Sequence, residues 1–138
     1  GGEGDVSRDE LTAAARDALE NAYAPYSRFR VGCALLGESG TVYTGCNVEN
    51  ASFGLTICAE RSALVRAVSM GERRFTHAVI VSDAAVPVAP CGACREVLAE
   101  FAPGLNIESV APDGASSTWT LDALLPARFD LPEAEVSS

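Results

Sequence analysis

The stretch TICAERSAL, Thr56–Leu64, places a cysteine, a glutamate and an arginine where an apolar helix begins. This helix is predicted to open near Cys58 and to end at Gly71, because glycine is the residue type that most often closes a helix. The start of a helix carries partial positive charge and N–H groups without intrahelical partners, which stabilise a thiolate relative to a thiol. The stretch therefore indicates a helix suited to burial that has a reactive thiol at its N-terminus.

Elements of both kinds flank this helix. Ser7 and Glu10 form a capping-box pattern, which predicts a first helix that runs to about Tyr23 and stops before Pro25. Periodicity and turn residues predict the other elements, namely a hairpin over 31–46, buried strands over 75–83 and 105–110, a helix over 91–101 and a short helix over 120–125. This order predicts an α/β fold, a three-layer sandwich in which helices flank a mixed β-sheet.

Length and composition restrict the possible partners. The chain has 138 residues, 48% of them hydrophobic, which suits a single domain over 1–138 with flexible termini at 1–6 and 131–138. With 19 acidic and 10 basic residues the formal charge is -9, so the surface repels nucleic-acid phosphates and anionic membranes. We therefore expect a small-molecule substrate and neither a nucleic-acid nor a membrane partner. The lack of a recognisable secretory signal favours a cytoplasmic location.

Three of the five cysteines form a pattern typical of metal binding. Cys58 begins one predicted helix, and Cys91 and Cys94 lie in the first turn of another, on one face. If the two helices follow neighbouring strands of the sheet, their N-termini converge at one edge. Three cysteine ligands would leave a tetrahedral Zn²⁺ with one open position, which is typical of a catalytic site.

Glu60 and Arg61 fit the same interpretation. Zinc lowers the pKa of bound water to about 7, and Glu60, in the first turn of the helix, is placed to carry the released proton. Three thiolates outweigh the charge of Zn²⁺, and Arg61 can offset the excess by donating to the ligand sulfurs. The alternative interpretations are a helix acid favoured by the dipole for Glu60 and an exposed surface charge for Arg61.

Other interpretations of the cysteines stay open on spacing alone. The PCGAC segment, Pro90–Cys94, has the spacing of a redox-active pair. Cys33 or Cys46 could instead serve as a fourth ligand of a structural zinc in a non-enzymatic, zinc-stabilised binding module. The simpler interpretation of Cys33 and Cys46 is that they are small buried residues of the hairpin.

The ligand motifs resemble those of a known family. Zinc nucleobase deaminases carry His or Cys, then x-Glu, followed by Pro-Cys-x-x-Cys, and this chain has CAE at Cys58–Glu60 and PCGAC at Pro90–Cys94. The chain is similar to the homotetrameric cytidine deaminases of pyrimidine salvage over 26–129, through the segments YSRFRVGCAL, GCNVENASFGLTICAERSAL, PCGACREVLAEF and LLPARF. An ordered set of this length is far more specific than a single PCxxC.

The resemblance implies an activity. Cys58, Cys91 and Cys94 would hold one Zn²⁺ per chain, whose bound hydroxide attacks C4 of cytosine while Glu60 moves protons between the water, N3 and the departing ammonia. The expected reaction is the hydrolytic deamination of cytidine and 2′-deoxycytidine to uridine and 2′-deoxyuridine. Alternatives are a related zinc deaminase of a modified cytosine nucleoside, of the blasticidin type, and a polynucleotide deaminase, which the acidic charge disfavours.

The resemblance also implies how the substrate is bound. Asn47 and Glu49 match the pair that hydrogen-bonds the ribose 3′-hydroxyl, and Phe29 matches the aromatic residue that packs beside the nucleoside. The backbone of Ala59 is expected to read the edge of the base. These contacts suit a free nucleoside, because a buried 3′ oxygen leaves no room for a continuing phosphodiester.

Assembly is the last expectation that the resemblance carries. In the family, neighbouring subunits of a homotetramer complete each active site, and the matching positions here are Phe53 and Phe129. Phe53 departs from the tyrosine usual at its position, so the contact with a neighbour loses a hydroxyl. Glu96 departs from the usual glutamine and adds a carboxylate to the helix that bears two cysteines.

Overall fold

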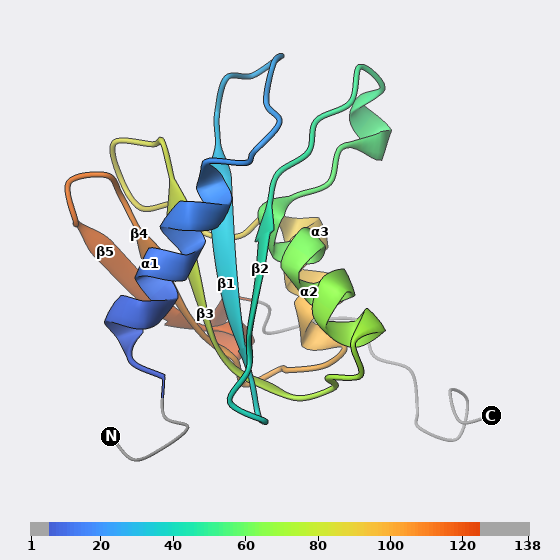
Figure 1. The fold of residues 1–138 in the computed structure, drawn as a ribbon, viewed down its shortest axis with the longest axis vertical. Coiled ribbons are helices and arrows are strands. Elements are labelled where there is room, and N and C mark those ends of the chain that lie inside the picture. The colour runs from blue at the N-terminus through green and yellow to red at the C-terminus, as the bar shows by residue number, and fades with distance from the viewer. Residues whose placement is uncertain (1–5, 125–138) are drawn as a thin grey trace.

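A five-stranded mixed sheet forms the middle layer of the protein (Figure 1). The structure is a computed structural model that describes residues 6–124. Its strands pair in the order β2-β1-β3-β4-β5; β3 and β4 are parallel and the other neighbours antiparallel. They comprise β1 Val31–Gly37, β2 Val42–Cys46, β3 Phe75–Ser82, β4 Asn106–Val110 and β5 Ser116–Thr120.

Helices cover both faces of this sheet. On one face α1, Arg8–Leu19, lies across the sheet, and on the other α2, Ala59–Ser69, and α3, Gly92–Ala99, lie side by side (Figure 1). Two short elements complete the described chain, the 3₁₀ helix η1, Phe53–Leu55, and α4, Leu121–Leu124. The expected three-layer α/β sandwich is therefore confirmed. None of the helices within residues 6–124 combines the length and the apolar character that crossing a membrane requires.

The α1 layer is held by aliphatic packing. The Ser7 hydroxyl accepts from the Glu10 N–H at 3.1 Å, so the predicted helix start is confirmed. The helix sits so close to the sheet that a Cβ on Gly32 would lie 2.1 Å from the Ala15 carbonyl oxygen. The buried cluster beneath it consists of Leu11, Ala15, Leu19, Ala34, Val79, Val81 and Val110.

The first helix is shorter than predicted. It ends at Leu19 and not near Tyr23, because the backbone beyond it turns towards another part of the chain. The Tyr23 N–H donates to the Asn47 carbonyl at 3.0 Å, and the Glu49 N–H donates to the Tyr23 carbonyl at 2.8 Å. This bridge replaces the last helical turn and ties the start of 47–57 to the body of the protein.

The α2 layer contains the larger core and an equally close approach. A Cβ on Gly45 of β2 would lie 2.3 Å from the Ala63 nitrogen and 2.7 Å from the Ala59 carbonyl oxygen, so glycine is required where the first turns of α2 cross the strand. At the other end of α2, Gly71 has a φ of +99°, in the left-handed region. The predicted closing glycine is therefore confirmed.

The expectation that the two cysteine-bearing helices follow neighbouring strands is wrong. The helices α2 and α3 follow β2 and β3, which are not neighbours, because β1 lies between them. Both strands are antiparallel to β1 and therefore run in the same direction, so they deliver their helices to the same edge of the sheet. The two N-termini meet over β1, and the expected convergence holds.

One described strand was not predicted. Strand β5, Ser116–Thr120, is an edge strand of small polar residues, in which Trp119 is the one large side chain. Of the predicted flexible termini, Val6 is described and packs partly buried against the α1 cluster. The other residues of 1–6 and 131–138 lie outside the described residues, as does Phe129.

Candidate metal centre and active site

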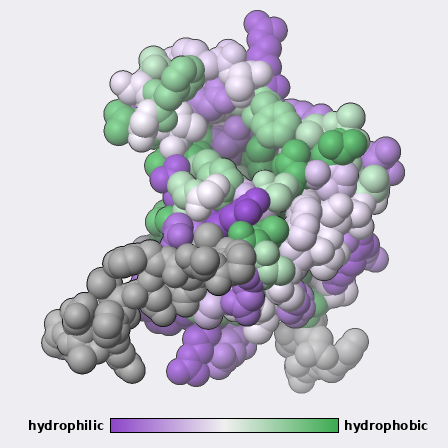
Figure 2. All heavy atoms as spheres, turned by 180° about the vertical axis from the view of Figure 1, so that it is seen from behind, coloured by the Kyte–Doolittle hydropathy of each residue, from purple (hydrophilic) through white to green (hydrophobic). Residues whose placement is uncertain are grey.

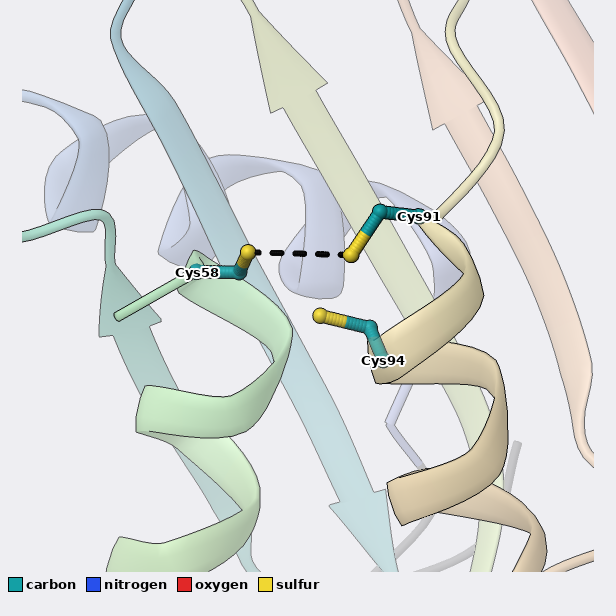
Figure 3. A group of neighbouring side chains, drawn as sticks. All are labelled: Cys58, Cys91 and Cys94. Carbon is teal, nitrogen blue, oxygen red and sulfur yellow. Dashed lines mark hydrogen bonds between the residues drawn. The ribbon is translucent and has the colours of Figure 1, made fainter. Parts of the chain in front are cut away.

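Three cysteine sulfurs meet between the starts of α2 and α3 (Figure 3). The Sγ atoms of Cys58, Cys91 and Cys94 all lie within 4.8 Å of one another, and those of Cys58 and Cys91 are 3.7 Å apart. Figure 3 shows the three side chains pointing toward a common centre, with Cys58 just before α2, Cys91 just before α3 and Cys94 in the first turn of α3. The structure therefore brings together the three cysteines that the sequence predicted as ligands.

Two of the three cysteines occupy helix N-cap positions. Cys58 precedes α2 and Cys91 precedes α3, each with extended backbone geometry, and neither side chain makes a capping hydrogen bond within the described residues. Cys94 lies in the first turn of α3 and is fully buried. Both helix dipoles thus direct their positive ends at the cluster, where they favour negative charge.

The cluster already favours a thiolate. A hydrogen bond from Cys94, followed by the Arg61 guanidinium and Cys91, lowers the pKa of the Cys58 thiol to about 5, although burial opposes the shift. The pKa of Cys94 is raised, first by its hydrogen bond to Cys58 and then by burial. One sulfur is therefore ionised at neutral pH while a neighbour keeps its proton, which is the arrangement expected of thiols that share a site.

Arg61 lies against this cluster as predicted. Its Nη2 donates to the Thr56 carbonyl at 3.0 Å and approaches the Cys58 sulfur at 3.9 Å. The contact with Cys58 raises the pKa of Arg61, so the guanidinium stays charged. Its Nε is buried without a hydrogen-bond partner among the described residues. A buried N–H donor without a partner is costly. Further negative charge on the nearby cysteine sulfurs would attract the guanidinium and so offset part of this cost.

The donor set fits zinc. Three sulfurs bound to one tetrahedral Zn²⁺ at about 2.3 Å would lie about 3.8 Å apart, and the Cys58 and Cys91 sulfurs are 3.7 Å apart. Cys33 and Cys46 are not part of the cluster within residues 6–124. Cys33 is fully buried in the core and Cys46 is half-buried at the end of β2. A three-cysteine site of this kind leaves a fourth coordination position for water.

A cavity of about 270 Å³ opens beside the cluster. Glu60 lies in its wall and is 6% exposed, and burial raises the pKa of its carboxyl group. A raised pKa suits a residue that must both accept and donate a proton near neutral pH. The lining residues, called the site cavity below, are Phe29, Val31, Asn47, Thr56, Cys58, Ala59, Glu60, Ile80, Val88, Ala89 and Cys91.

The site cavity includes three of the four predicted substrate-binding residues. Phe29, Asn47 and Ala59 line it together with two of the cysteines. Asn47 is buried, and its side chain bridges two backbone groups: Oδ1 accepts from the Val31 N–H at 2.9 Å and Nδ2 donates to the Phe29 carbonyl at 2.8 Å. The second N–H of the Asn47 amide has no partner among residues 6–124 and can donate to a ligand.

The other predicted residues lie outside the lining of the site cavity. Glu49 accepts hydrogen bonds from the segment that carries Phe29. Phe53 is 82% exposed on η1, at the tip of a projecting segment. The projecting segment, residues 48–57, lies at the upper left of Figure 2, which shows apolar side chains on its surface. Its exposed large apolar residues are Val48, Phe53, Leu55 and Ile57. Glu96 is exposed on α3.

Sequence reasoning missed several wall residues. Val31, Ile80 and Val88 are apolar residues of two strands and a loop, and nothing in their local pattern distinguishes a cavity wall from core. Thr56 was identifiable only by its position two residues before Cys58. Each of these residues reaches the cavity through strand pairing or loop packing, which a linear pattern does not encode.

The chain resembles known deaminases over most of its length. The family described as "Cytidine and deoxycytidylate deaminase zinc-binding region" matches residues 6–107. A cytidine deaminase of Sporosarcina psychrophila is 47% identical over 122 residues, which are 88% of this chain and 90% of that protein. The crystal structure of cytidine deaminase from Burkholderia pseudomallei has a TM-score of 0.87 and 44% identity, covering 90% of this chain and 100% of that one.

A second solved structure agrees. The cytidine deaminase from Mycobacterium tuberculosis has a TM-score of 0.79 and 41% identity, covering 92% of this chain and 100% of that one. The chain therefore belongs to the cytidine deaminase family, with its zinc-binding deaminase region. The expectations of a zinc-dependent deaminase and of Zn²⁺ as its cofactor are confirmed.

Proposed function

We propose that the chain hydrolyses cytidine and 2′-deoxycytidine to uridine and 2′-deoxyuridine, with release of ammonia. The observation that carries the proposal is the position of buried Glu60 in the wall of the site cavity, beside three converging cysteine sulfurs. Water replaces the exocyclic amino group, so the overall reaction needs no co-reactant other than water. The relatives described above bear the name of this activity.

The cysteines and Arg61 have a shared task. Cys58, Cys91 and Cys94 would hold Zn²⁺, which when bound acidifies water and so supplies a nucleophile at neutral pH. Arg61, at 3.9 Å from the Cys58 sulfur, offsets the negative charge of the thiolates. This balance keeps the metal centre electrophilic and holds the start of α2 against the cluster.

Glu60 moves the protons. Its carboxylate takes a proton from the attacking water and delivers it to N3 of the cytosine ring. It then takes the second proton from the new hydroxyl group on C4, which becomes the carbonyl of uracil, and gives that proton to the amino group as ammonia leaves. Burial of Glu60 raises the pKa of its carboxyl group, which brings the protonated and ionised forms closer in free energy.

The walls of the site cavity select a nucleoside. Phe29 offers an aromatic face to the base, and the backbone of Ala59 can pair with the polar edge of the base. Asn47 would donate its remaining amide N–H to the 3′-oxygen. Glu49, which lies outside the lining but holds the segment that carries Phe29, would accept a hydrogen bond from the 3′-hydroxyl. An acidic chain with a formal charge of -9 disfavours polynucleotide substrates.

The chain would act as a single domain over 1–138, assembled as a homotetramer in the cytoplasm. The exposed apolar side chains of 48–57 support the assembly, since a patch of this kind marks an interaction surface. Phe53 and Phe129 would each complete the site of a neighbouring subunit. Light scattering tests the assembly: we expect a mass four times that of one chain, and a monomer with full activity would contradict it.

Ammonia release from cytidine tests the activity. The zinc-loaded wild type is expected to release ammonia, and Glu60→Gln is expected to lose about 10²- to 10⁴-fold in kcat while it keeps zinc. An inactive wild type that holds zinc would favour the binding module. Release of ammonia only from a modified cytosine nucleoside would favour a deaminase of the blasticidin type.

A further inference from the structure

The segment that carries Phe29 into the site cavity has no regular secondary structure. It lies between α1 and β1, over 24–30, and Arg28 within it has a φ of 59°, in the left-handed region. Residues other than glycine adopt this conformation at a cost and keep it only where neighbouring contacts enforce it. The position of the Phe29 ring therefore depends on side-chain hydrogen bonds that hold the segment.

Glu49 and Ser27 supply those hydrogen bonds. The Glu49 Oε1 atom accepts from the Tyr26 N–H at 3.0 Å and from the Ser27 N–H at 3.1 Å, and Oε2 accepts from the Ser27 hydroxyl. The Ser27 hydroxyl in turn accepts from the Phe29 N–H at 3.0 Å. One hydroxyl group thus links the carboxylate of Glu49 to the backbone of Phe29.

The remaining capacity of Glu49 can be counted. A carboxylate offers about four acceptor positions, and donors among the described residues occupy two on Oε1 and one on Oε2. The last position is on Oε2, the oxygen that Ser27 holds. The Ser27 hydrogen bond is also the main cause that lowers the pKa of Glu49, so the group stays an ionised acceptor.

Asn47 binds the carbonyl group of Phe29. Its Nδ2 donates to the Phe29 carbonyl at 2.8 Å, so both backbone groups of Phe29 are bound within one network. The aromatic wall of the site cavity and the two polar residues assigned to the sugar are therefore not independent. Loss of the Ser27 hydroxyl would release Oε2 of Glu49 and the Phe29 N–H at the same time.

We propose that Ser27 is a positioning residue for nucleoside binding, which orients the one free acceptor of Glu49 toward the sugar 3′-hydroxyl and couples it to Phe29. This inference rests on the proposed function and adds a residue to it. Ser27 does not line the site cavity, so it would act on binding of the sugar and not on the proton transfers of Glu60.

The test compares the zinc-loaded full chain with Ser27→Ala on cytidine and on 3′-deoxycytidine, which lacks the hydroxyl. Loss of a hydrogen bond to a charged group is expected to raise KM for cytidine about tenfold, with kcat within about twofold. The KM for 3′-deoxycytidine should rise by a smaller factor, because that substrate is affected only by the release of Phe29, so the preference for cytidine should fall several-fold, about three- to tenfold. Ser27→Thr keeps a hydroxyl and should restore both values.

Ser39→Ala is the matched control. Ser39 also hydrogen-bonds a glutamate, Glu72, on the turn between β1 and β2 and away from the site cavity, so its loss should leave KM and the substrate preference unchanged. If Ser27→Ala does not fold, Ser27→Cys serves instead, because a thiol is a weak donor and acceptor.

Two results would overturn the inference alone: an unchanged preference for cytidine in folded Ser27→Ala or Ser27→Cys, or a fall in kcat without a rise in KM. A wild type that releases no ammonia from cytidine would overturn the proposed function first and this inference with it.

Discussion

The backbone N–H groups at the start of α1 are capped by a side chain, whereas those at the starts of α2 and α3 are not. Ser7 caps α1, and its hydroxyl accepts from the Glu10 N–H at 3.1 Å. Cys58 and Cys91 occupy the equivalent positions of α2 and α3 without a capping hydrogen bond within the described chain. A good cap is worth about 1 kcal/mol, so two helices on the catalytic face give up stability. The difference shows that these two helix starts are organised for a ligand.

The largest break in this comparison comes from removing a sulfur. Cys94→Ala should lose zinc and lower ammonia release by more than about 100-fold, since even partners of metal ligands cost 10- to 100-fold. Metal analysis and the ammonia assay measure both effects. Cys46→Ala removes a cysteine outside the cluster and should keep zinc. Equal zinc loss in the two variants would contradict the assignment.

Two glycines, one under each helix layer, allow the two faces of the sheet to be tested separately. Gly45→Ala and Gly32→Ala should each cost about 1–3 kcal/mol in free energy of unfolding, because the added Cβ meets backbone at 2.3 Å and 2.1 Å. Only Gly45→Ala displaces the start of α2, so only it should weaken zinc retention against a chelator, about tenfold. Urea unfolding and chelator competition provide the readouts. Similar zinc loss in Gly32→Ala would mean that the faces are not independent.

The cap of α1 predicts a smaller effect. Ser7→Ala should lower the free energy of unfolding by about 1 kcal/mol and leave zinc content and kcat unchanged, because α1 lies on the face opposite the cluster. Urea unfolding with a parallel zinc analysis measures this. An altered zinc content would show that the capped helix contributes to the site.

The smallest effect has opposite signs with and without metal. Serine is a better N-cap than cysteine, so Cys58→Ser should raise the free energy of unfolding by about 0.5 kcal/mol in the presence of a chelator. In zinc the same variant should be less stable than the wild type, because a ligand is lost. Thermal melts in both conditions measure the crossing. If Cys58→Ser is less stable than the wild type both with chelator and with zinc, the cysteine does not cost the helix capping stability.

Local rules account for the parts of the fold that the sequence predicted. The Ser7 cap and the closing Gly71 depend on neighbouring residues only, and both are observed. The three cysteines were identifiable because each lies at a predicted helix start. Their convergence was correct for a partly wrong reason, since β1 separates the strands that precede the two helices.

Long-range pairing explains what the sequence did not predict. The helix α1 stops early because Tyr23 pairs with 47–49, far along the chain. Strand β5 is polar and lies at an edge, so it lacks the apolar alternation of a core strand, although the Pro-Asp-Gly turn before it was an available signal. The link between Ser27 and Glu49 joins two loops and has no periodicity to reveal it.

X-ray absorption at the zinc edge of the purified chain measures the ligands of the metal directly. A centre built on the starts of α2 and α3 predicts three sulfurs at about 2.3 Å and one lighter oxygen or nitrogen atom. Four sulfurs would indicate a closed structural site, and two or fewer would mean that the cysteines of the two helix starts do not share one ion.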